Sequence, residues 1–386
     1  MKRTLRLVSL ILAVLMLSVC FASCGNTNYA AKNTEYFIGA TGPLEGSTAV
    51  YGVSVQRGAQ IAIDEINAAG GLNGVNFKFD MKNDDSGVEK AVSGYNALRE
   101  AGMQLSLGSV TSKSAKAFGD LANEDQILFL TPSASADDVI GTGDYGFRVC
   151  FGDPQQGTIS ADTLTKDYKK IGVIYDTSDP YSAGIFEAFK AEMEKLGKKA
   201  DTDYVVKTFD KDNNKDFSTQ VGQLQDAQCD ILYLPFYYTE AALVIKSAKS
   251  KGFEVPVFGN DGFDGINGQI KAEDNITVSV KYTTPFDVTS TEEKVAKFVK
   301  TYKEKYNEEP TQFAADGYDA VLILFAAMKE AGINDVTMSA ADISNKVKAI
   351  LTNGTFKYDG LTGDGMSWEK SGSCNKEAKI VDLKFN

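Results

Sequence analysis

The strongest constraint on the fold is an alternation of short β-rich segments with segments of helical periodicity, which begins at Glu35. Strands are predicted at 36–40, 77–81, 105–108, 127–131 and 147–151, and again at 171–175, 204–209, 231–235 and 257–259. Helical periodicity lies between them at 53–69, 90–100, 115–123, 183–196, 217–227 and 238–251. Strands that alternate with helices of this length form βαβ units and parallel sheets covered on both faces. We therefore predict an α/β protein with two doubly wound parallel-sheet lobes.

The last third of the chain departs from this alternation. It contains helical segments near 292–306, 313–331 and 340–351, and then a final strand at 380–385. We expect this portion to complete both lobes, so that each lobe is discontinuous in sequence. Lobe 1 is predicted to comprise 35–152 and 285–357, and lobe 2 to comprise 153–284 and 358–386. A chain of 386 residues, 43% of them hydrophobic, is long enough to form two such cores.

The N-terminus has the pattern of an export signal. Lys2, Arg3 and Arg6 precede an apolar run at 7–19, and small residues follow it. A membrane-spanning helix needs about 20 apolar residues, and this run ends sooner in Ser, Cys and Gly. We predict that 1–23 is a signal peptide and that the protein acts outside the cytoplasm.

The end of this signal resembles a bacterial lipobox, the motif in which a cysteine is diacylated and becomes the new N-terminus. The segment is Phe21-Ala-Ser-Cys24, and Phe21 stands where that motif usually has Leu. The resemblance implies that Cys24 carries the lipid and that 24–34 form a short tether to the membrane. The protein would then lie in the periplasm or on the outer face of the cytoplasmic membrane.

Three further cysteines, Cys150, Cys229 and Cys374, remain after the signal. Their number is odd and no CxxC spacing occurs, so at least one stays free. One disulfide is compatible with an exported protein, but the sequence does not decide between the possible pairs. We assign these cysteines a structural or incidental role rather than a catalytic one.

Composition excludes several classes of function. The chain has no histidine, so it contains no Ser-His or Cys-His nucleophile and no His-ligated metal site. Forty basic and 52 acidic residues give a net charge of −12, which repels phosphate backbones, so we expect no nucleic-acid partner. A secreted enzyme with two catalytic carboxylates is a rival hypothesis, but no pair of carboxylates occurs together at a predicted strand end.

Two motifs resemble cofactor or metal sites, and both are better explained as loops. Residues 141–146 match GxGxxG, but a polar segment precedes them and a predicted strand follows, where a dinucleotide site has a strand and then a helix. Residues 210–214 resemble the start of a calcium loop, but Lys215 and Val221 stand where that loop has its glycine and glutamate. We expect no catalytic residue, no metal and no cofactor.

The ends of the predicted strands are where a ligand is expected. In open parallel sheets, ligands bind outside the carboxyl ends of the strands, close to the free N–H groups of helix N-termini. In lobe 1 the hydroxyl-rich loops 108–114 and 131–135 follow two successive strands. Hydroxyl and backbone N–H groups suit a carboxylate, although Ser and Thr also serve there as ordinary helix caps. Both interpretations of these loops remain open.

Lobe 2 has aromatic and acidic residues at its own strand ends. Tyr181 follows the segment 175–180, Tyr237 follows the strand at 231–235, and Asp261 follows the strand at 257–259. Together they offer aromatic walls and one anionic group, which suit an ammonium. A carboxylate receptor on one lobe that faces an ammonium receptor on the other is what a free amino acid requires.

Several segments follow the pattern of one known family. The most specific is 58–71, GAQIAIDEINAAGG, and the others are 38–43, 51–52, 127–132, 215–218, 230–234, 306–310 and 317–320. On these segments, which span nearly all of 35–386, the chain resembles the leucine/isoleucine/valine-binding family of type I periplasmic binding proteins. The resemblance implies two lobes joined by a multi-strand hinge, the fold known as a Venus flytrap. In some relatives lobe 1 carries a disulfide, but no cysteine pair here matches it.

The resemblance also implies roles for individual residues. Ser112 and Ser135 would hold the ligand carboxylate with their hydroxyls, and Ser133 would contribute main-chain groups. Asp261 would bind the ammonium where the family often has Glu, and a bridging water would offset the shorter side chain. The aromatic residues around the ligand would be Tyr181 and Tyr237, which close over it, and Tyr51, which lines its side-chain pocket.

The function implied is capture of a free amino acid, branched-chain or otherwise apolar, between two closing lobes. The closed form would then be recognised by the permease subunits of an ABC importer, with no bond made or broken. We expect the protein to act as a monomer. The alternative is a binder or sensor with the same fold for amides, urea or aromatic acids, which lack one of the two charged ends.

Overall fold

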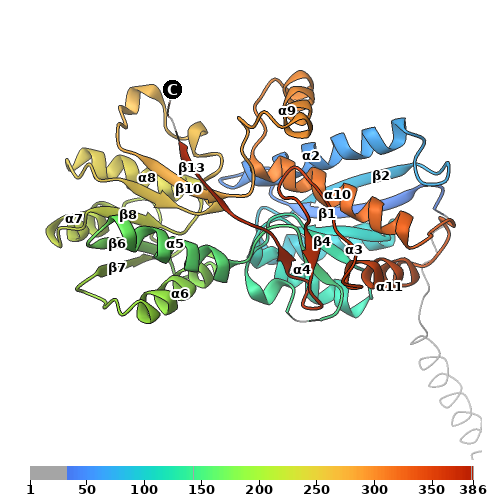
Figure 1. The fold of residues 1–386 in the computed structure, drawn as a ribbon, viewed down its shortest axis with the longest axis horizontal. Helices are drawn as coiled ribbons and strands as arrows, with labels where there is room; N and C mark the ends of the chain where they lie inside the picture. Colours follow the sequence, from blue (N-terminus) through green and yellow to red (C-terminus); the bar gives the residue numbers. More distant parts are fainter. Residues whose placement is uncertain (1–32, 142, 384, 386) are drawn as a thin grey trace, which may run out of the picture.

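The computed structural model describes residues 33–141, 143–383 and 385, and it contains two parallel sheets side by side (Figure 1). The predicted signal peptide, Cys24 and most of the tether lie outside the described residues. Within the described part of the chain, no helix combines the length and apolar character needed to cross a membrane. The predicted α/β class with two doubly wound sheets is confirmed.

The first sheet has five parallel strands in the order β2-β1-β3-β4-β5. The strands are β1 (Tyr36–Gly42), β2 (Phe77–Asn83), β3 (Leu105–Ser109), β4 (Phe129–Thr131) and β5 (Gly146–Arg148). Alternate residues of a strand face opposite sides, so Ile38 packs in one core and Phe37 in another. The helices on the two faces are α2 (Ala49–Ala68) with α10 (Gln312–Glu330), and α3 (Val88–Glu100) with α4 (Ser112–Glu124).

The helices α2 and α10 lie very close together, because glycines stand where they cross. A Cβ atom at Gly58 would lie 1.8 Å from the carbonyl oxygen of Ala314, and one at Gly317 would lie 2.7 Å from that of Val55. Only glycine permits this backbone approach. Two further helices complete this half, α9 (Glu293–Tyr306) and α11 (Ala340–Leu351).

The second sheet has six strands in the order β13-β10-β9-β8-β6-β7, and only the β10–β13 pair is antiparallel. The strands are β6 (Ile171–Asp176), β7 (Tyr204–Phe209), β8 (Ile231–Leu234), β9 (Val257–Gly259), β10 (Val280–Thr284) and β13 (Lys379–Leu383). The helices on its two faces are α5 (Asp153–Asp167) with α6 (Pro180–Lys195), and α7 (Ser218–Asp226) with α8 (Tyr238–Ser250). Short 3₁₀ turns follow β4 and β9, η1 (Asp137–Val139) and η2 (Asp261–Phe263).

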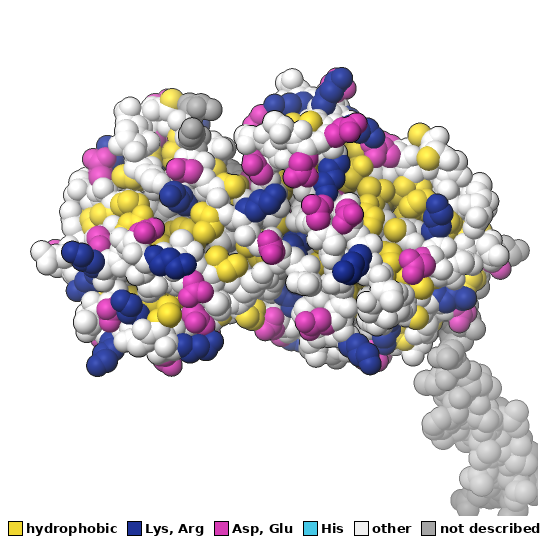
Figure 2. All heavy atoms as spheres, in the orientation of Figure 1, with side chains coloured by type: hydrophobic (Ala, Val, Ile, Leu, Met, Phe, Trp, Pro, Cys, Tyr) yellow, Lys and Arg dark blue, Asp and Glu magenta, His cyan; other side chains and the backbone are white. Residues whose placement is uncertain are grey.

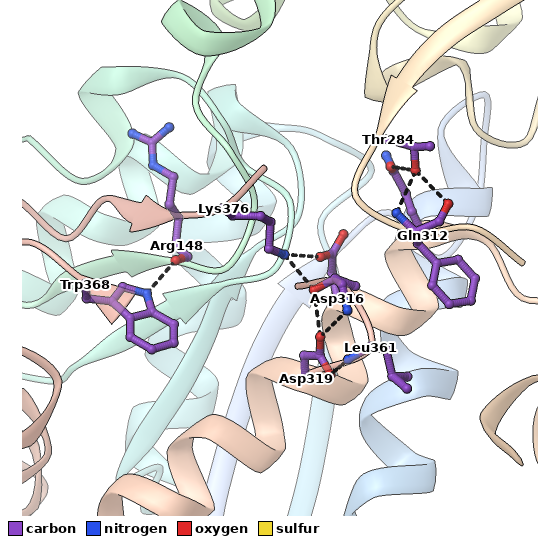
Figure 3. A network of polar contacts seen from close by, with 10 residues as sticks. Arg148, Thr284, Gln312, Asp316, Asp319, Leu361, Trp368 and Lys376 are labelled. Carbon is purple, nitrogen blue, oxygen red and sulfur yellow. Dashed lines mark hydrogen bonds and ion pairs between the residues drawn. The ribbon is translucent and has the colours of Figure 1, made fainter. Parts of the chain in front are cut away.

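The chain passes between the two sheets at 149–152, 285–292 and 376–378, which is the multi-strand connection expected of a hinge (Figure 1). The last passage follows two short paired strands, β11 (Ser367–Trp368) and β12 (Cys374–Asn375). The indole Nε1 of Trp368 donates to the carbonyl of Arg148 at 2.8 Å, so β11 lies against the first sheet (Figure 3). The C-terminal region 358–386, which we predicted for lobe 2, therefore contacts both halves.

Among the longer elements α5 and β10 were not predicted, and neither were the short strands β11 and β12. The buried face of α5 consists largely of small and polar residues such as Gln156, Gly157 and Ser160, so it shows no apolar periodicity. The predicted strand at 147–151 is shorter, because pairing ends at Arg148. Cys150, Cys229 and Cys374 are buried free thiols.

Acidic and basic side chains are interspersed on the face of the described residues shown in Figure 2. No basic stripe of the kind that tracks a nucleic-acid backbone crosses this face.

Candidate functional site

A cavity lies between the two halves, at the carboxyl ends of the strands. Its volume is about 10 Å³, which is about the space of one water molecule, so a ligand can enter only when the two halves move apart. Six of the seven predicted residues line it, and the set of lining residues is Tyr51, Val110, Thr111, Ser112, Ser133, Tyr181, Tyr237, Asp261, Gly262 and Phe313. The expected ligand position at the strand ends therefore coincides with a real cavity.

The first half contributes the loops that follow β3 and β4. The Ser112 hydroxyl, at the start of α4, accepts a hydrogen bond from the Ala136 N–H at 3.2 Å. The Ser133 hydroxyl donates to the Val110 carbonyl at 2.7 Å. These bonds fix one loop against the other beside the first turn of α4, whose free N–H groups favour an anion. Ser112 can still donate its hydroxyl proton to a ligand.

Thr111 belongs to the same wall but was not predicted. It precedes α4, it is 3% exposed, and its hydroxyl has no hydrogen-bond partner among the described residues. An unpaired buried hydroxyl on a cavity wall is available to a ligand. The sequence signal was present, because Thr111 lies between Val110 and Ser112 in the loop that we singled out.

Ser135 is the predicted residue that does not line this cavity. It is fully buried behind the wall, and its carbonyl accepts hydrogen bonds from the Asp153 N–H at 3.0 Å and from the Arg148 guanidinium. Its hydroxyl has no hydrogen-bond partner among the described residues. Ser135 thus joins the β4 loop to the start of α5, and its assignment to the ligand carboxylate stays a prediction.

The second half contributes two stacked tyrosines. The rings of Tyr181 and Tyr237 are 4.9 Å apart between centroids and inclined by 4°. Tyr181 is placed by the start of α6, where the Asp179 side chain caps the helix by accepting from the Tyr181 N–H at 3.0 Å, and Pro180 occupies the first turn. Burial raises the pKa values of both phenols well above 10, so both remain neutral. They form a flat aromatic wall.

Asp261 is the acidic group of this half and is 4% exposed. Its Oδ1 accepts from the Tyr181 hydroxyl at 2.6 Å, and its backbone N–H donates to Oε1 of Gln156 at 3.2 Å. Burial raises the pKa of Asp261 to about 6, and the Tyr181 hydroxyl and the Gln156 side chain counteract part of this rise. Within the described residues Asp261 has no ion-pair partner. A cation placed beside it would be attracted more strongly than one beside an exposed carboxylate.

Tyr51 spans the cavity from the first half to the second. It extends from α2, and its hydroxyl donates to the Gly262 carbonyl at 2.5 Å and accepts from the Tyr238 N–H at 3.3 Å. Its ring lies 5.4 Å from that of Tyr237 and 4.4 Å from that of Phe313. Phe313 was missed because it lies in the long apolar run of α10, where the sequence shows only a core helix. Tyr51 therefore holds the two halves together.

The first turn of α10 is itself fixed by a buried polar network (Figure 3). Gln312 donates to the Asp261 carbonyl at 3.0 Å and accepts from the Thr284 hydroxyl at 2.6 Å. One turn further on, Asp316 forms a fully buried ion pair with Lys376 at 3.1 Å. Burial raises the pKa of Asp316 to about 7, although the Lys376 ammonium opposes this rise. The network joins the site to the C-terminal passage between the sheets.

Comparison with known proteins gives a consistent result. Residues 35–385 match the family described as periplasmic binding proteins. A Leu/Ile/Val-binding protein homolog of Brucella melitensis is 29% identical, over 91% of this chain and 94% of that protein. A leucine binding protein of Thermotoga maritima has a TM-score of 0.79 at 25% identity, covering 90% of this chain and 95% of that one.

A second solved structure is a branched-chain amino acid transporter substrate binding protein of Streptococcus pneumoniae in complex with isoleucine. Its TM-score is 0.78 at 27% identity, and the match covers 90% of this chain and all of that one. In each case the similarity extends over both halves and therefore includes the cavity between them.

Proposed function

The chain belongs to the periplasmic binding protein family, and on that premise we propose that it captures a free apolar amino acid between its lobes for an ABC importer. We infer from the family description that it is a binding protein outside the cytoplasm and not an enzyme. The observation that carries the proposal is the division of the cavity wall: hydroxyl and N–H donors on one half, and a buried carboxylate on the other.

The donors of the first half are matched to a carboxylate. Thr111 and Ser112 stand at the start of α4, where the helix dipole adds a favourable field to their hydroxyl groups. On the opposite half, Asp261 is matched to an ammonium because no cation in the described part of the chain is paired with it. A zwitterion is held at both ends only when both halves approach it.

The remaining wall is aromatic and is matched to an apolar side chain. Tyr51, Tyr237 and Phe313 enclose one side of the cavity with their rings. The names of the relatives point the same way, since they are Leu/Ile/Val-binding, leucine binding, or solved with isoleucine. We therefore infer a branched-chain ligand.

Closure is the step that links binding to transport. The chain segments at 149–152, 285–292 and 376–378 join the lobes and would act as the hinge, and the Tyr51–Gly262 hydrogen bond would form only when the lobes are together. A ligand that contacts both lobes stabilises the closed form by its differential affinity for it. The importer's permease would recognise that closed form.

Location follows from the family and from the N-terminal sequence. We propose that diacylated Cys24 and the tether that follows it hold the protein at the membrane, in the periplasm or on the outer face. The two lobes of one chain supply the whole cavity, so a monomer is sufficient for binding.

Titration calorimetry of the purified protein against single amino acids, urea, small amides and benzoate tests the proposal. The expected result is micromolar or tighter binding of leucine, isoleucine or valine, and none of urea or benzoate. Binding of urea, an amide or an aromatic acid in preference to every amino acid would refute amino-acid capture and favour the alternative ligand class.

A further inference from the structure

A second cavity lies beside the first, between η1, the start of α5 and the start of α6. Its volume is about 240 Å³, and it is lined by Ala136, Asp137, Asp138, Asp153, Pro154, Pro180 and Gly184. Pro180 directly precedes Tyr181, and Ala136 directly follows Ser135, so this cavity adjoins the wall of the first. Like the first cavity, it is built from both halves of the molecule.

Asp153 is the unusual residue of this cavity. It is 1% exposed, and neither oxygen of its carboxylate accepts a hydrogen bond of ordinary geometry from the described residues. A Cβ atom at Gly184, on the α6 wall, would lie 2.7 Å from Oδ2 of Asp153. The carboxylate therefore lies at the α6 wall of the cavity. A buried charge without a partner is costly, and proteins keep one only where something offsets it.

The cation of the protein nearest in the chain does not fill this role. The Arg148 guanidinium donates to the carbonyls of Ser135 and Ala136 and pairs with Asp137 at 3.4 Å, and it forms no ion pair with Asp153. Burial raises the pKa of Asp153 well above its usual value, and the Asp261 carboxylate raises it further, whereas the Ser135 hydroxyl and the Arg148 guanidinium lower it. The two buried carboxylates thus repel each other, and the Arg148 guanidinium offsets part of the cost at Asp153 without pairing with it.

We propose that the Asp153 cavity is a second anionic subsite, which receives an organic ammonium group of the bound ligand. Among the described residues, no cluster of carboxylates or thiols has the arrangement of a metal site, so an organic cation is the matching chemistry. The ammonium is either the α-ammonium of an apolar amino acid, shared with Asp261, or a cationic side chain that extends past Ser135. This inference rests on the proposed function and adds to it a second anionic partner for the ligand.

The test is titration calorimetry with leucine, with the 2-hydroxy acid of the same carbon skeleton, and with lysine. Each ligand is measured against the wild-type protein, Asp153→Asn and the control Asp226→Asn, which removes one exposed charge at the end of α7. A further variant, Gly184→Ala, places a methyl group against Oδ2 of Asp153 without breaking α6.

We expect Asp153→Asn to weaken leucine at least tenfold and the hydroxy acid less than twofold, which identifies the α-ammonium as the group received. A loss confined to lysine would instead identify a side-chain cation. Gly184→Ala should reproduce the loss, and thermal unfolding should show that free Asp153→Asn is as stable as the wild type, or more so.

Leucine and lysine affinities within twofold of the wild type in both variants would overturn the subsite and leave amino-acid capture intact. Failure of the wild-type protein to bind leucine or lysine would overturn the proposed function and this inference together. A fall in the affinity for the hydroxy acid equal to that for leucine would also overturn the subsite, because it shows an effect unrelated to the ammonium.

Discussion

Replacement of Asp261 by asparagine tests two effects of this buried carboxylate: its contribution to ligand affinity and its destabilisation of the free protein. Asparagine keeps the size of the side chain and can still accept from the Tyr181 hydroxyl, which lies 2.6 Å from Oδ1. Hydrogen bonds to a charged group contribute about 1.5–3 kcal/mol, so loss of the charge should weaken amino-acid binding about ten- to two-hundred-fold. Calorimetry at pH 8 with the best-binding amino acid measures this change directly.

The pH dependence gives a second readout for the same variant. The pKa of Asp261 in the free protein is about 6, so the carboxylate is charged above that pH and protonates below it. Wild-type affinity should be full above pH 7 and fall as the pH decreases through 6, approaching tenfold for each further unit. In Asp261→Asn this dependence should be absent.

As the pH falls, the stability of the free protein should rise, whereas its affinity for the amino acid should fall. Because the folded-state pKa of Asp261 is raised from 3.8 to about 6, the folded protein binds more protons than the unfolded chain between these values. The buried charge therefore destabilises the free protein above pH 6 by about 3 kcal/mol, and this cost disappears below pH 4. Free Asp261→Asn should unfold at a higher temperature than the wild type at pH 8.

The control is Asp226→Asn, which removes an exposed carboxylate far from the cavity in the fold. It should leave the affinity, its pH dependence and the unfolding temperature unchanged. Affinity of Asp261→Asn within twofold of the wild type at pH 8 would refute the assignment of Asp261 to the ammonium. If the affinity of Asp261→Asn kept the pH dependence of the wild type, that result would refute the assignment as well.

Three further predictions follow from other contacts. Tyr51→Phe removes the hydrogen bond to the Gly262 carbonyl, which contributes about 0.5–1.5 kcal/mol. Because this loss destabilises the closed form, calorimetry should show binding weakened about two- to tenfold, and an unchanged affinity would show that the bond does not stabilise the closed form. Lys376→Met leaves Asp316 buried without its partner and should cost about 3–5 kcal/mol of unfolding free energy in urea at pH 8, whereas a loss below 1 kcal/mol would contradict it. Cys24→Ala should move the protein from the membrane fraction to the soluble fraction of lysed cells, and retention at the membrane would exclude the lipid anchor.

The local pattern of the sequence was sufficient to predict most of the strands and helices. The predicted bounds of β7 and β9 agree with the structure at both ends, because these strands are short apolar runs between clear turn residues. The helix α5 was missed because tertiary packing, and not an apolar stripe, holds its small and polar residues in place. Both outcomes follow from one rule, that periodicity reports burial only when the buried face is apolar.

The site was predicted in part, for a related physical reason. Loops at strand ends are recognisable in sequence, so six of the predicted residues line the cavity. Phe313 belongs to a helix that the alternating pattern does not connect to those loops, and only the packing of α10 brings it to the cavity. Its contribution could not be predicted from spacing along the chain.

The central claim is that one zwitterion is held at its two charged ends by opposite halves of the molecule. A crystal structure of the protein with bound leucine tests it most directly. We predict the leucine carboxylate within hydrogen-bond distance of Thr111 or Ser112, and its ammonium beside Asp261, with the lobes closed. A ligand with both charged groups on one half, or an Asp261 carboxylate without contact to it, would contradict the account.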